Sequence, residues 1–595
     1  MDHMDKKSKS KLKLRYKRLA LHVKHAEGAT QRHASRFILR RINNIRMVMT
    51  EIMIWLVAVG LLIAGLGAQY TWNMRGNQHD GARPGGVYVE GMIGDVGTLN
   101  PLLASSEPEQ AAAKLLFSSL YNYDLTGALH TDLAKSMTVR NDKIYTVKLR
   151  DAVWHDGQKL TAEDVVYTIN LIKNPQIRSP LRVNWLDISA RAIDPSTVEF
   201  VLPAVYAGFS HALTFPIVPK HILQNVSSSS MREADFSSNP VGSGPFIIKR
   251  VQTTESTGST DVVRMVPNSK YYGTVSTLSR LELRAYGDES LLAKAVKSGE
   301  VSAASGLSLS AADRIKSPQY TTKHWLLNKG VYLLMNSRSQ ILQDTKVRKA
   351  LRYATDTSAI RSAVGDNVAR LDTPVLQSQI AQRLPSAPPY DLAKAKALLK
   401  EAGWTYNQGQ WKGKDGKPLA IAVTTSSGRD EYKKIVDVLK QQWSKLGVDV
   451  QLREIDTSST TTSFVQSVLQ PRDYDALLYE LELGSDPDVF AYWHSSQASA
   501  SGYNFANYSN RTADTDLVGG RSRTNSALRS AKYAQFTSQW LNDTPAIGLY
   551  QSVGSYVLNK GVSIVEPRGS INTMNDRYTG VTMWSTGKAS VYKTP

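Results

Sequence analysis

Residues 419–452 read LAIAVTTSSGRDEYKKIVDVLKQQWSKLGVDVQL, and they combine two apolar runs with an amphipathic segment between them. Residues 419–425 are typical of a buried strand, and residues 448–452 are typical of a second one. Residues 430–446 place apolar side chains along one helical face, and Gly447 ends this helix. Two strands joined by a helix form a βαβ unit, so at least part of the chain is a parallel sheet covered by helices.

A strand followed by a helix also occurs earlier in the chain. Tyr145, Val147 and Leu149 alternate with polar residues, as they do in a half-buried strand. The turn at residues 155–157 is followed by a helix, for which Thr161 is the predicted N-cap. Strand-like and helix-like stretches continue to alternate toward the C-terminus without any fixed repeat, which predicts an α/β protein.

The N-terminal end carries most of the excess charge. The 595 residues have a formal net charge of +20, yet residues 1–46 alone hold fourteen Lys and Arg against three Asp and Glu. The uncharged residues 52–74 follow, and at about 1.5 Å rise per residue they can cross a hydrocarbon layer about 30 Å thick. Because basic flanks stay on the cytoplasmic side, we expect a cytoplasmic tail, a transmembrane helix over residues 47–74 and an extracytoplasmic remainder.

A cleaved signal peptide is the alternative to an uncleaved anchor, since residues 65–68 are mostly small. The basic tail itself would attract anionic headgroups of the inner leaflet. From residue 84 onward the excess charge is only +9 over more than five hundred residues. Such a mildly basic surface gives no support to a nucleic-acid partner.

The sequence lacks the patterns that catalysis or metal binding requires. It contains no Cys, which excludes thiol nucleophiles, disulfides and thiolate metal sites. The common nucleophile, phosphate-binding and zinc motifs do not occur in it. His155 precedes an Asp-Gly pair and is typical of a turn. The spaced pairs His22/His25 and Asp486/Asp488 have no third metal ligand in sight, so we expect no catalytic residue, metal or cofactor.

An acidic and aromatic cluster is the best candidate for a binding site. Glu480 and Glu482 alternate with leucines, so both carboxylates leave the same face of a predicted strand. An Asp-Pro loop at Asp486 follows, and Tyr492 and Trp493 come next. Carboxylates with large aromatic side chains at a strand end suit a cleft that holds an amine and packs its substituents. The alternative is an exposed strand edge protected by charge.

Several separated motifs occur in the order known for one protein family. They are Thr98-Leu-Asn-Pro-Leu, residues 145–167, Asn239-Pro-Val-Gly-Ser-Gly-Pro-Phe, Tyr332-Leu-Leu-Met-Asn, residues 395–404, Asp486-Pro-Asp and Pro545-Ala-Ile-Gly-Leu-Tyr. From about residue 85 to its C-terminus the chain resembles the family-5 extracellular solute-binding proteins, the oligopeptide and dipeptide receptors of ABC importers. The resemblance implies a two-lobed α/β fold of the periplasmic-binding-protein type II, with an extra subdomain in lobe I.

The composition of the N-terminal residues and the resemblance together predict how the chain is divided. The expected parts are a basic tail (1–46), a transmembrane helix (47–74), a tether (75–85), lobe I (86–120, 241–325 and 545–595), an inserted subdomain (121–240) and lobe II (329–544). Two segments would cross between the lobes, and the hinge residues expected on them are Tyr332, Asn336 and Tyr550.

Such a receptor captures peptides between hinged lobes and delivers them unaltered to permease and ATPase subunits. In the family, an acidic residue before the Asp-Pro loop commonly pairs with the ligand ammonium. Here Leu483 stands near that position, and Glu482 or Glu480 is the nearest carboxylate. Relatives commonly hang from a lipid on an N-terminal Cys, which this chain lacks, and its apolar helix can replace that anchor. The apolar helix thus predicts a single-pass protein, and we expect its extracytoplasmic part to be monomeric.

Two alternatives share this fold. The cargo can be an oligosaccharide or a chelated metal such as nickel, and Trp493, Tyr503 and Asn504 would suit a sugar site of stacked rings and neutral hydrogen-bonding groups. The chain can also be a membrane-anchored sensor that no longer transports. The ligand-binding residues expected from the sequence are Glu480, Glu482, Asp486, Trp493, Tyr503 and Asn504.

Overall fold

The computed structural model describes residues 45–592, apart from residues 77, 83–84, 180, 253–259, 366 and 457–462. The chain divides into two compact units, one of residues 1–81 with 589–595 and the other of residues 82–588. Nearly all of the basic tail expected over residues 1–46 lies outside the described residues.

The first unit contains the long apolar helix α2 (Ile45–Gly76). Its stretch Met49–Trp72 has 24 residues and is long and apolar enough to cross a membrane. Strands β1 (Gln78–Ala82) and β20 (Lys588–Tyr592) form a separate two-stranded sheet. The helix has the length and composition that the sequence predicted for an anchor, and whether it is retained or cleaved stays a prediction.

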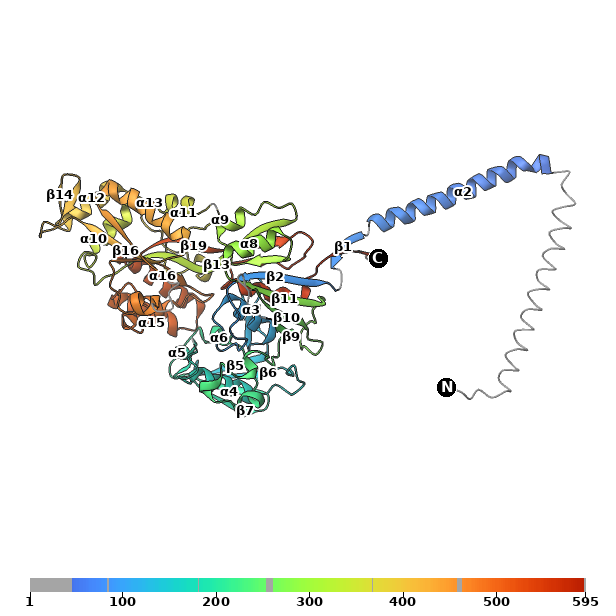
Figure 1. Ribbon diagram of the computed structural model, residues 1–595, viewed down its shortest axis with the longest axis horizontal. Helices are drawn as coiled ribbons and strands as arrows, with labels where there is room; N and C mark the ends of the chain where they lie inside the picture. The colour runs from blue at the N-terminus through green and yellow to red at the C-terminus, as the bar shows by residue number, and fades with distance from the viewer. Residues whose placement is uncertain are drawn as a thin grey trace. The chain divides into compact units, whose positions relative to one another are not determined.

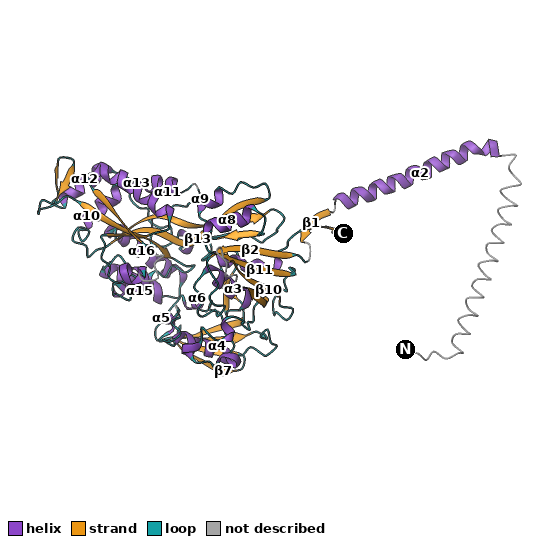
Figure 2. Ribbon diagram, in the orientation of Figure 1, coloured by secondary structure: helices purple, strands orange, loops and turns teal. Residues whose placement is uncertain are grey.

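The second unit is built around one ten-stranded sheet with helices packed along it (Figures 1 and 2). The strand order is β17-β16-β18-β13-β19-β12-β2-β11-β10-β9. These strands are β2 (Val87–Ile93), β9 (Phe246–Gln252), β10 (Thr260–Pro267), β11 (Arg280–Tyr286), β12 (Ala303–Ser305), β13 (Tyr320–Met335), β16 (Ala420–Ser426), β17 (Asp449–Ile455), β18 (Ala476–Glu482) and β19 (Ala546–Asn559). The main helices are α3 (Glu107–Leu116), α8 (Glu289–Lys297), α9 (Leu309–Asp313), α10 (Thr345–Tyr353), α11 (Thr357–Val364), α12 (Leu392–Glu401), α13 (Asp430–Leu446), α15 (Arg511–Ser522) and α16 (Ser526–Asp543).

The βαβ unit predicted from the sequence is present. β16 and β17 pair in parallel, and α13 connects them. α13 buries Ile435, Leu439 and Trp443, which belong to the predicted apolar face. Gly447 has φ of +92°, a left-handed conformation that glycine adopts without strain, and it ends the helix.

β13 and β19 form one antiparallel pair that runs through both lobes. Residues 320–326 of β13 pair with β19 on one side of a register break, and residues 330–334 pair with it on the other side. Residues 327–329 lie in the break and stand opposite Ser552. The longest interruption of the backbone ladder therefore lies where the two lobes join, and a second, shorter register shift follows between Val331 and Tyr332.

Separate hydrophobic cores lie on the two sides of this break. Trp325 and Leu558 belong to the core of lobe I, whereas Leu333 and Ile547 belong to a core of lobe II. The two-lobed α/β fold is thus confirmed. The lobe boundaries expected from the sequence stay a prediction.

The inserted subdomain contains a four-stranded antiparallel sheet in the order β5-β6-β8-β7. Its strands are β5 (Ala134–Arg140), β6 (Ile144–Leu149), β7 (Ser189–Asp194) and β8 (Thr197–Val201), and α4 (Ala162–Lys173) packs against β7 and β8. The predicted N-cap of α4 is confirmed, because Thr161 and Asp164 form a capping box. The predicted alternation in β6 is also confirmed, since Tyr145, Val147 and Leu149 are buried.

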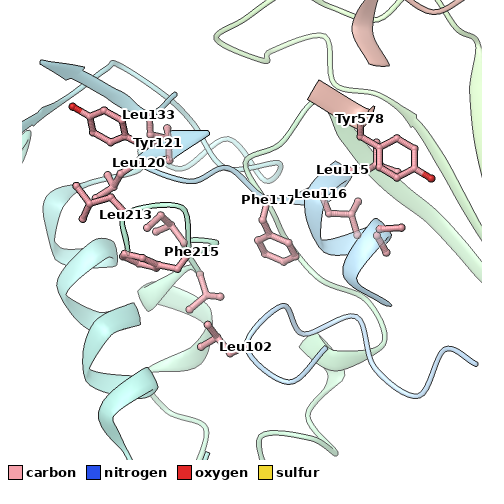
Figure 3. Close-up of a cluster of buried hydrophobic side chains, with 14 of the residues drawn as sticks. Leu102, Leu115, Leu116, Phe117, Leu120, Tyr121, Leu133, Leu213, Phe215 and Tyr578 are labelled. Carbon is pink, nitrogen blue, oxygen red and sulfur yellow. The ribbon is translucent and has the colours of Figure 1, made fainter. Parts of the chain in front are cut away.

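The inserted subdomain shares its core with lobe I. Figure 3 shows Phe117, which follows α3, with Leu115 on one side of it and Leu213 and Phe215 of the inserted subdomain on the other. All four side chains belong to one buried cluster. The inserted subdomain and lobe I are therefore expected to move as one body.

His155 adds a polar link between the inserted subdomain and lobe I. Its Nδ1 accepts a hydrogen bond from the Gly242 N–H at 3.1 Å, and its Nε2 donates to the Gly244 carbonyl at 3.2 Å. A Cβ on Gly242 would lie 1.8 Å from the carbonyl oxygen of Leu116, so only glycine allows this approach. The neutral imidazole satisfies both bonds, and burial lowers the pKa of His155 to about 4.

This pKa predicts a pH dependence of stability. Because the pKa in the unfolded chain is near 6.5, the unfolded state takes up the proton first as the pH falls, and stability decreases from about pH 6.5 toward pH 4. We expect His155→Gln to lose less unfolding free energy than the wild type between about pH 7 and pH 5, by about 1 to 2 kcal/mol. Urea unfolding of the full chain in detergent, followed by tryptophan fluorescence, measures this difference.

The matched control is His130→Gln, which removes a histidine from the exposed surface. Parallel pH profiles for His155→Gln and the wild type would show that His155 does not stay neutral in the folded protein.

Candidate functional site

A cavity of about 710 Å³ lies at the carboxyl ends of β16 and β18 in lobe II. Ligands of α/β sheets usually bind at this end of the strands, and cavities for small ligands usually have roughly 300 to 1,000 Å³. The first turn of α13, the end of β18 and the segment 500–505 contribute side chains to its wall. The cavity therefore has the position and the size of a small-ligand site.

The first charged pair in the wall joins β18 to the crossing strand β13. Glu482 and Lys329 are register partners, and the Lys329 Nζ lies 2.7 Å from the Glu482 Oε1. The Glu482 side chain is 70% exposed. The Lys329 side chain is 20% exposed, so one partner of the pair is half-buried and the other is open to solvent. A pair of this kind contributes about 1 kcal/mol, so a ligand ammonium can compete with the lysine for Glu482.

The second charged group in the wall is linked to the register break. Glu480 accepts a hydrogen bond from the Ser552 hydroxyl at 2.5 Å, and its other oxygen lies 3.8 Å from the Arg429 guanidinium. Ser552 is the β19 residue opposite the break between the two ladder blocks. The Glu480 carboxylate thus connects the cavity wall to the crossing strand β19.

Arg429 is held in place by an aromatic ring. Its guanidinium lies over the Tyr432 ring at 5.1 Å and donates to the Tyr432 hydroxyl at 3.2 Å. Burial alone would lower the pKa of Arg429, but Tyr432 and Glu480 raise it above its usual value. The nearest Glu480 oxygen is too far for a hydrogen bond, so a ligand carboxylate can compete for this cation.

Aromatic rings form much of the remaining wall. Tyr479 packs edge-on against Phe505 at 5.7 Å, and Tyr503 packs edge-on against the same ring at 6.1 Å. The Tyr492 hydroxyl donates to the Glu482 carbonyl at 2.8 Å. Burial raises the pKa of Tyr479 and of Tyr492, so both remain neutral. The wall thus combines flat apolar faces with two cations and two carboxylates.

Three of the six predicted ligand-binding residues line this cavity, namely Glu480, Glu482 and Tyr503. As the alternation in the sequence predicted, Glu480 and Glu482 leave the same face of β18. Tyr503 is 49% exposed and has ring surface available. Contact of Glu480, Glu482 and Tyr503 with a ligand stays a prediction.

The other three predicted residues, Asp486, Trp493 and Asn504, do not line this cavity, and their contact with a ligand also stays a prediction. Asp486 binds Arg529 with both carboxylate oxygens, at 2.5 and 2.6 Å, and its side chain is 12% exposed. Trp493 is fully buried and packs edge-on against Trp540 at 5.3 Å. Asn504 is fully buried, and its amide donates to the Tyr508 carbonyl at 2.8 Å. Trp493 and Asn504 thus pack inside lobe II, and Asp486 pairs with an arginine of lobe II.

The predicted hinge residues lie on the lobe II side of the crossing. Tyr332 directly follows a second register irregularity in β13, and Tyr550 pairs with Val331. Asn336 is buried, and its amide donates to the Tyr474 carbonyl at 2.9 Å. Their role in hinge motion stays a prediction, and the main break in the ladder is at residues 327–329.

The site residues predicted from the sequence do not include Lys329, Arg429 or Tyr479, and Tyr492 is named in the acidic and aromatic cluster but not among the six ligand-binding residues. Arg429 directly precedes the predicted helix, and Tyr492 directly precedes the Trp493 that was selected, so both had a nearby signal. Lys329 gave no local signal, because it meets Glu482 only through the pairing of β13 with β18.

The sequence profile of the bacterial extracellular solute-binding proteins, family 5, matches residues 128–503. The oligopeptide-binding protein AppA of Bacillus subtilis is 26% identical over 482 residues, which cover 78% of this chain and 86% of AppA. Solved structures share the fold, and two of them are NikZ and CtaP. NikZ from Campylobacter jejuni in complex with Ni(L-His) is 27% identical with a TM-score of 0.70, covering 84% of this chain and 99% of NikZ. The substrate-binding protein CtaP from Listeria monocytogenes is 25% identical with a TM-score of 0.73, covering 85% of this chain and 100% of CtaP.

The different surroundings of Asp486 and Glu482 predict different effects on stability. Asp486→Asn leaves the Arg529 guanidinium buried without its anionic partner, so we expect a loss of about 3 kcal/mol of unfolding free energy. Glu482→Gln breaks an exposed pair and should cost less than about 1 kcal/mol. Urea unfolding of the full chain measures both, and equal losses would contradict this division between a structural and an exposed carboxylate.

Proposed function

This chain belongs to the bacterial extracellular solute-binding proteins of family 5, and from this premise we propose that it is the receptor of an ABC importer that captures peptides. The cargo is held between the two lobes and handed unaltered to permease and ATPase subunits in the membrane. The helix α2 anchors the chain, so the receptor remains next to its permease without a lipid. This role requires binding and release and no catalytic step.

The single observation that carries the choice of peptides is the charge pattern of the cavity. A peptide brings an ammonium, a carboxylate and apolar side chains, and the wall offers carboxylates, cations and ring faces within one space. Glu482 is the exposed carboxylate, and Arg429 is the cation without a close hydrogen-bonded carboxylate. We assign the ligand ammonium to Glu482 and the ligand carboxylate to Arg429.

Closure follows from differential affinity. A ligand that touches both lobes binds the closed form more tightly than the open form and shifts the population toward it. The break at residues 327–329 is where the paired strands can bend with the least loss of backbone hydrogen bonds. Glu480 bonds to Ser552 beside this break, so occupancy of the cavity and bending at the hinge involve neighbouring groups.

The cargo is tested directly by freeing the purified full chain of carried molecules and titrating it by calorimetry. A set of di- to nonapeptides, the nickel–histidine complex and a set of oligosaccharides form the three arms. We expect saturable heat with peptides. Binding confined to the nickel complex or to a saccharide would replace the peptide assignment, and mass spectrometry of the molecules carried by the untreated protein gives an independent identification.

The assigned roles predict how blocked peptides behave. Glu482→Gln should weaken binding of a free peptide at least about tenfold, because a charge-assisted bond to the ammonium contributes roughly 1.5 to 3 kcal/mol. An N-acetylated peptide lacks that ammonium, so its affinity should be nearly the same for the wild type and for Glu482→Gln. Arg429→Gln should likewise weaken binding of a free peptide, whereas a C-terminally amidated peptide should bind the wild type and Arg429→Gln with nearly the same affinity. Calorimetry of these combinations measures each coupling separately.

The matched control is Glu401→Gln, an exposed glutamate on α12 outside the cavity wall. If N-acetylation and Glu482→Gln weaken binding additively, the ammonium is held by another group, and Glu480→Gln becomes the next variant to measure.

A further inference from the structure

A segment of the inserted subdomain contacts lobe II directly. The segment 206–211 includes most of the short helix α6 (Phe209–Ala212) and lies against the end of α15. Figure 1 shows α6 and α15 in neighbouring parts of the molecule. The Ala207 N–H donates to the Arg521 carbonyl at 2.9 Å. The inserted subdomain shares the core of lobe I, whereas α15 and α16 belong to a core of lobe II. This backbone bond therefore crosses between the lobes.

The side chain of Arg521 adds a second contact across the lobes. Its guanidinium lies 4.8 Å from the Tyr206 ring of the inserted subdomain and 4.6 Å from the Phe490 ring of lobe II. Its Nε lies 3.1 Å from the buried carboxylate of Asp488. The cation is thus held in lobe II by Asp488 and Phe490 and offers a face to Tyr206. Cation–ring contacts of this kind are strongest where water is excluded.

Asp486 takes part in a third contact. Its carboxylate binds Arg529 within lobe II and lies 3.6 Å from the His211 Nε2 of the inserted subdomain. The other ring nitrogen of His211 lies 2.9 Å from the Tyr123 hydroxyl. Gly208 brings the backbone close to this group, since a Cβ there would lie 3.2 Å from the Asp486 Oδ1. The Asp486-Pro-Asp488 loop is therefore occupied by interlobe and internal contacts.

We propose that the segment 206–211 and the loop around Asp486 and Asp488, together with Arg521, form a latch that holds the two lobes together. None of its contacts passes through the cavity, so the latch acts without a ligand. Opening about the break in β13 and β19 separates the inserted subdomain from lobe II and breaks all three contacts at once. The latch thereby sets the fraction of closed molecules before cargo binds, and the apparent affinity scales with this competent fraction.

The latch is tested by measuring the distance between the lobes. The chain has no Cys, so Thr138→Cys in the inserted subdomain and Ala527→Cys in α16 give two exposed labelling sites without background. Spin labels on the full chain in detergent, freed of carried molecules by dialysis against mild denaturant, report the ratio of short to long distances. We expect a short-distance population in the wild type without added peptide.

Two variants remove the ring contact from opposite sides. Tyr206→Leu keeps an apolar side chain, and Arg521→Lys keeps the charge next to Asp488 while losing the flat guanidinium. Each should lower the ratio of closed to open molecules about threefold to tenfold. The double variant should lower it no further than the stronger single change, because both remove the same contact. Tyr390→Leu, an exposed tyrosine of lobe II, is the matched control.

Distance distributions that are the same for the wild type and both variants would overturn the latch, whether all are short or all are long. If Tyr206→Leu does not fold, Arg521→Lys decides alone. The expected loss of peptide affinity by the same factor rests on the proposed function, whereas the distance measurement does not. A shifted distance ratio without any peptide binding would therefore support the latch and reject only the cargo.

Discussion

The pairing of β13 with β19 is the constraint on which the rest of the structure depends. One antiparallel ladder continues from lobe I into lobe II, so neither lobe can move without bending it. Backbone hydrogen bonds resist this bending wherever the ladder is regular. The break at residues 327–329 weakens that resistance where the lobes join, and the separate cores on its two sides keep each lobe rigid. A hinge between two rigid bodies follows from this arrangement.

The features that could be predicted from the sequence are those set by neighbours along the chain. The helix from Asp430 to Leu446 begins and ends where the apolar period and Gly447 predict, because period and cap are local signals. The Thr161 cap and the alternation of Glu480 and Glu482 are of the same kind. The spacing of apolar and polar residues along the chain is enough to place these residues on a helix or on one face of a strand.

The features that could not be predicted depend on partners far away in the sequence. Lys329 becomes part of the cavity because β18 pairs with β13 in one register, and that register is fixed by packing across 153 residues. The sequence predicted Trp493 as a ring that stacks on a ligand, yet in the helix Phe490–Trp493 its side chain faces the core and that of its neighbour Tyr492 faces the cavity. The larger apolar ring takes the core, since burial stabilises it more.

The division of the four acidic residues near the end of β18 follows from the same geometry. Asp486 and Asp488 sit in a loop that meets arginines of α15 and α16, and burial of these carboxylates requires such partners. Glu480 and Glu482 stay on the strand, where solvent and the cavity reach them. The four carboxylates look alike in the sequence, but they form two pairs in the structure. Asp486 and Asp488 bind arginines of the same chain, whereas Glu480 and Glu482 are open to a ligand. Closure and capture act on adjacent groups, so the same short segment can couple the two.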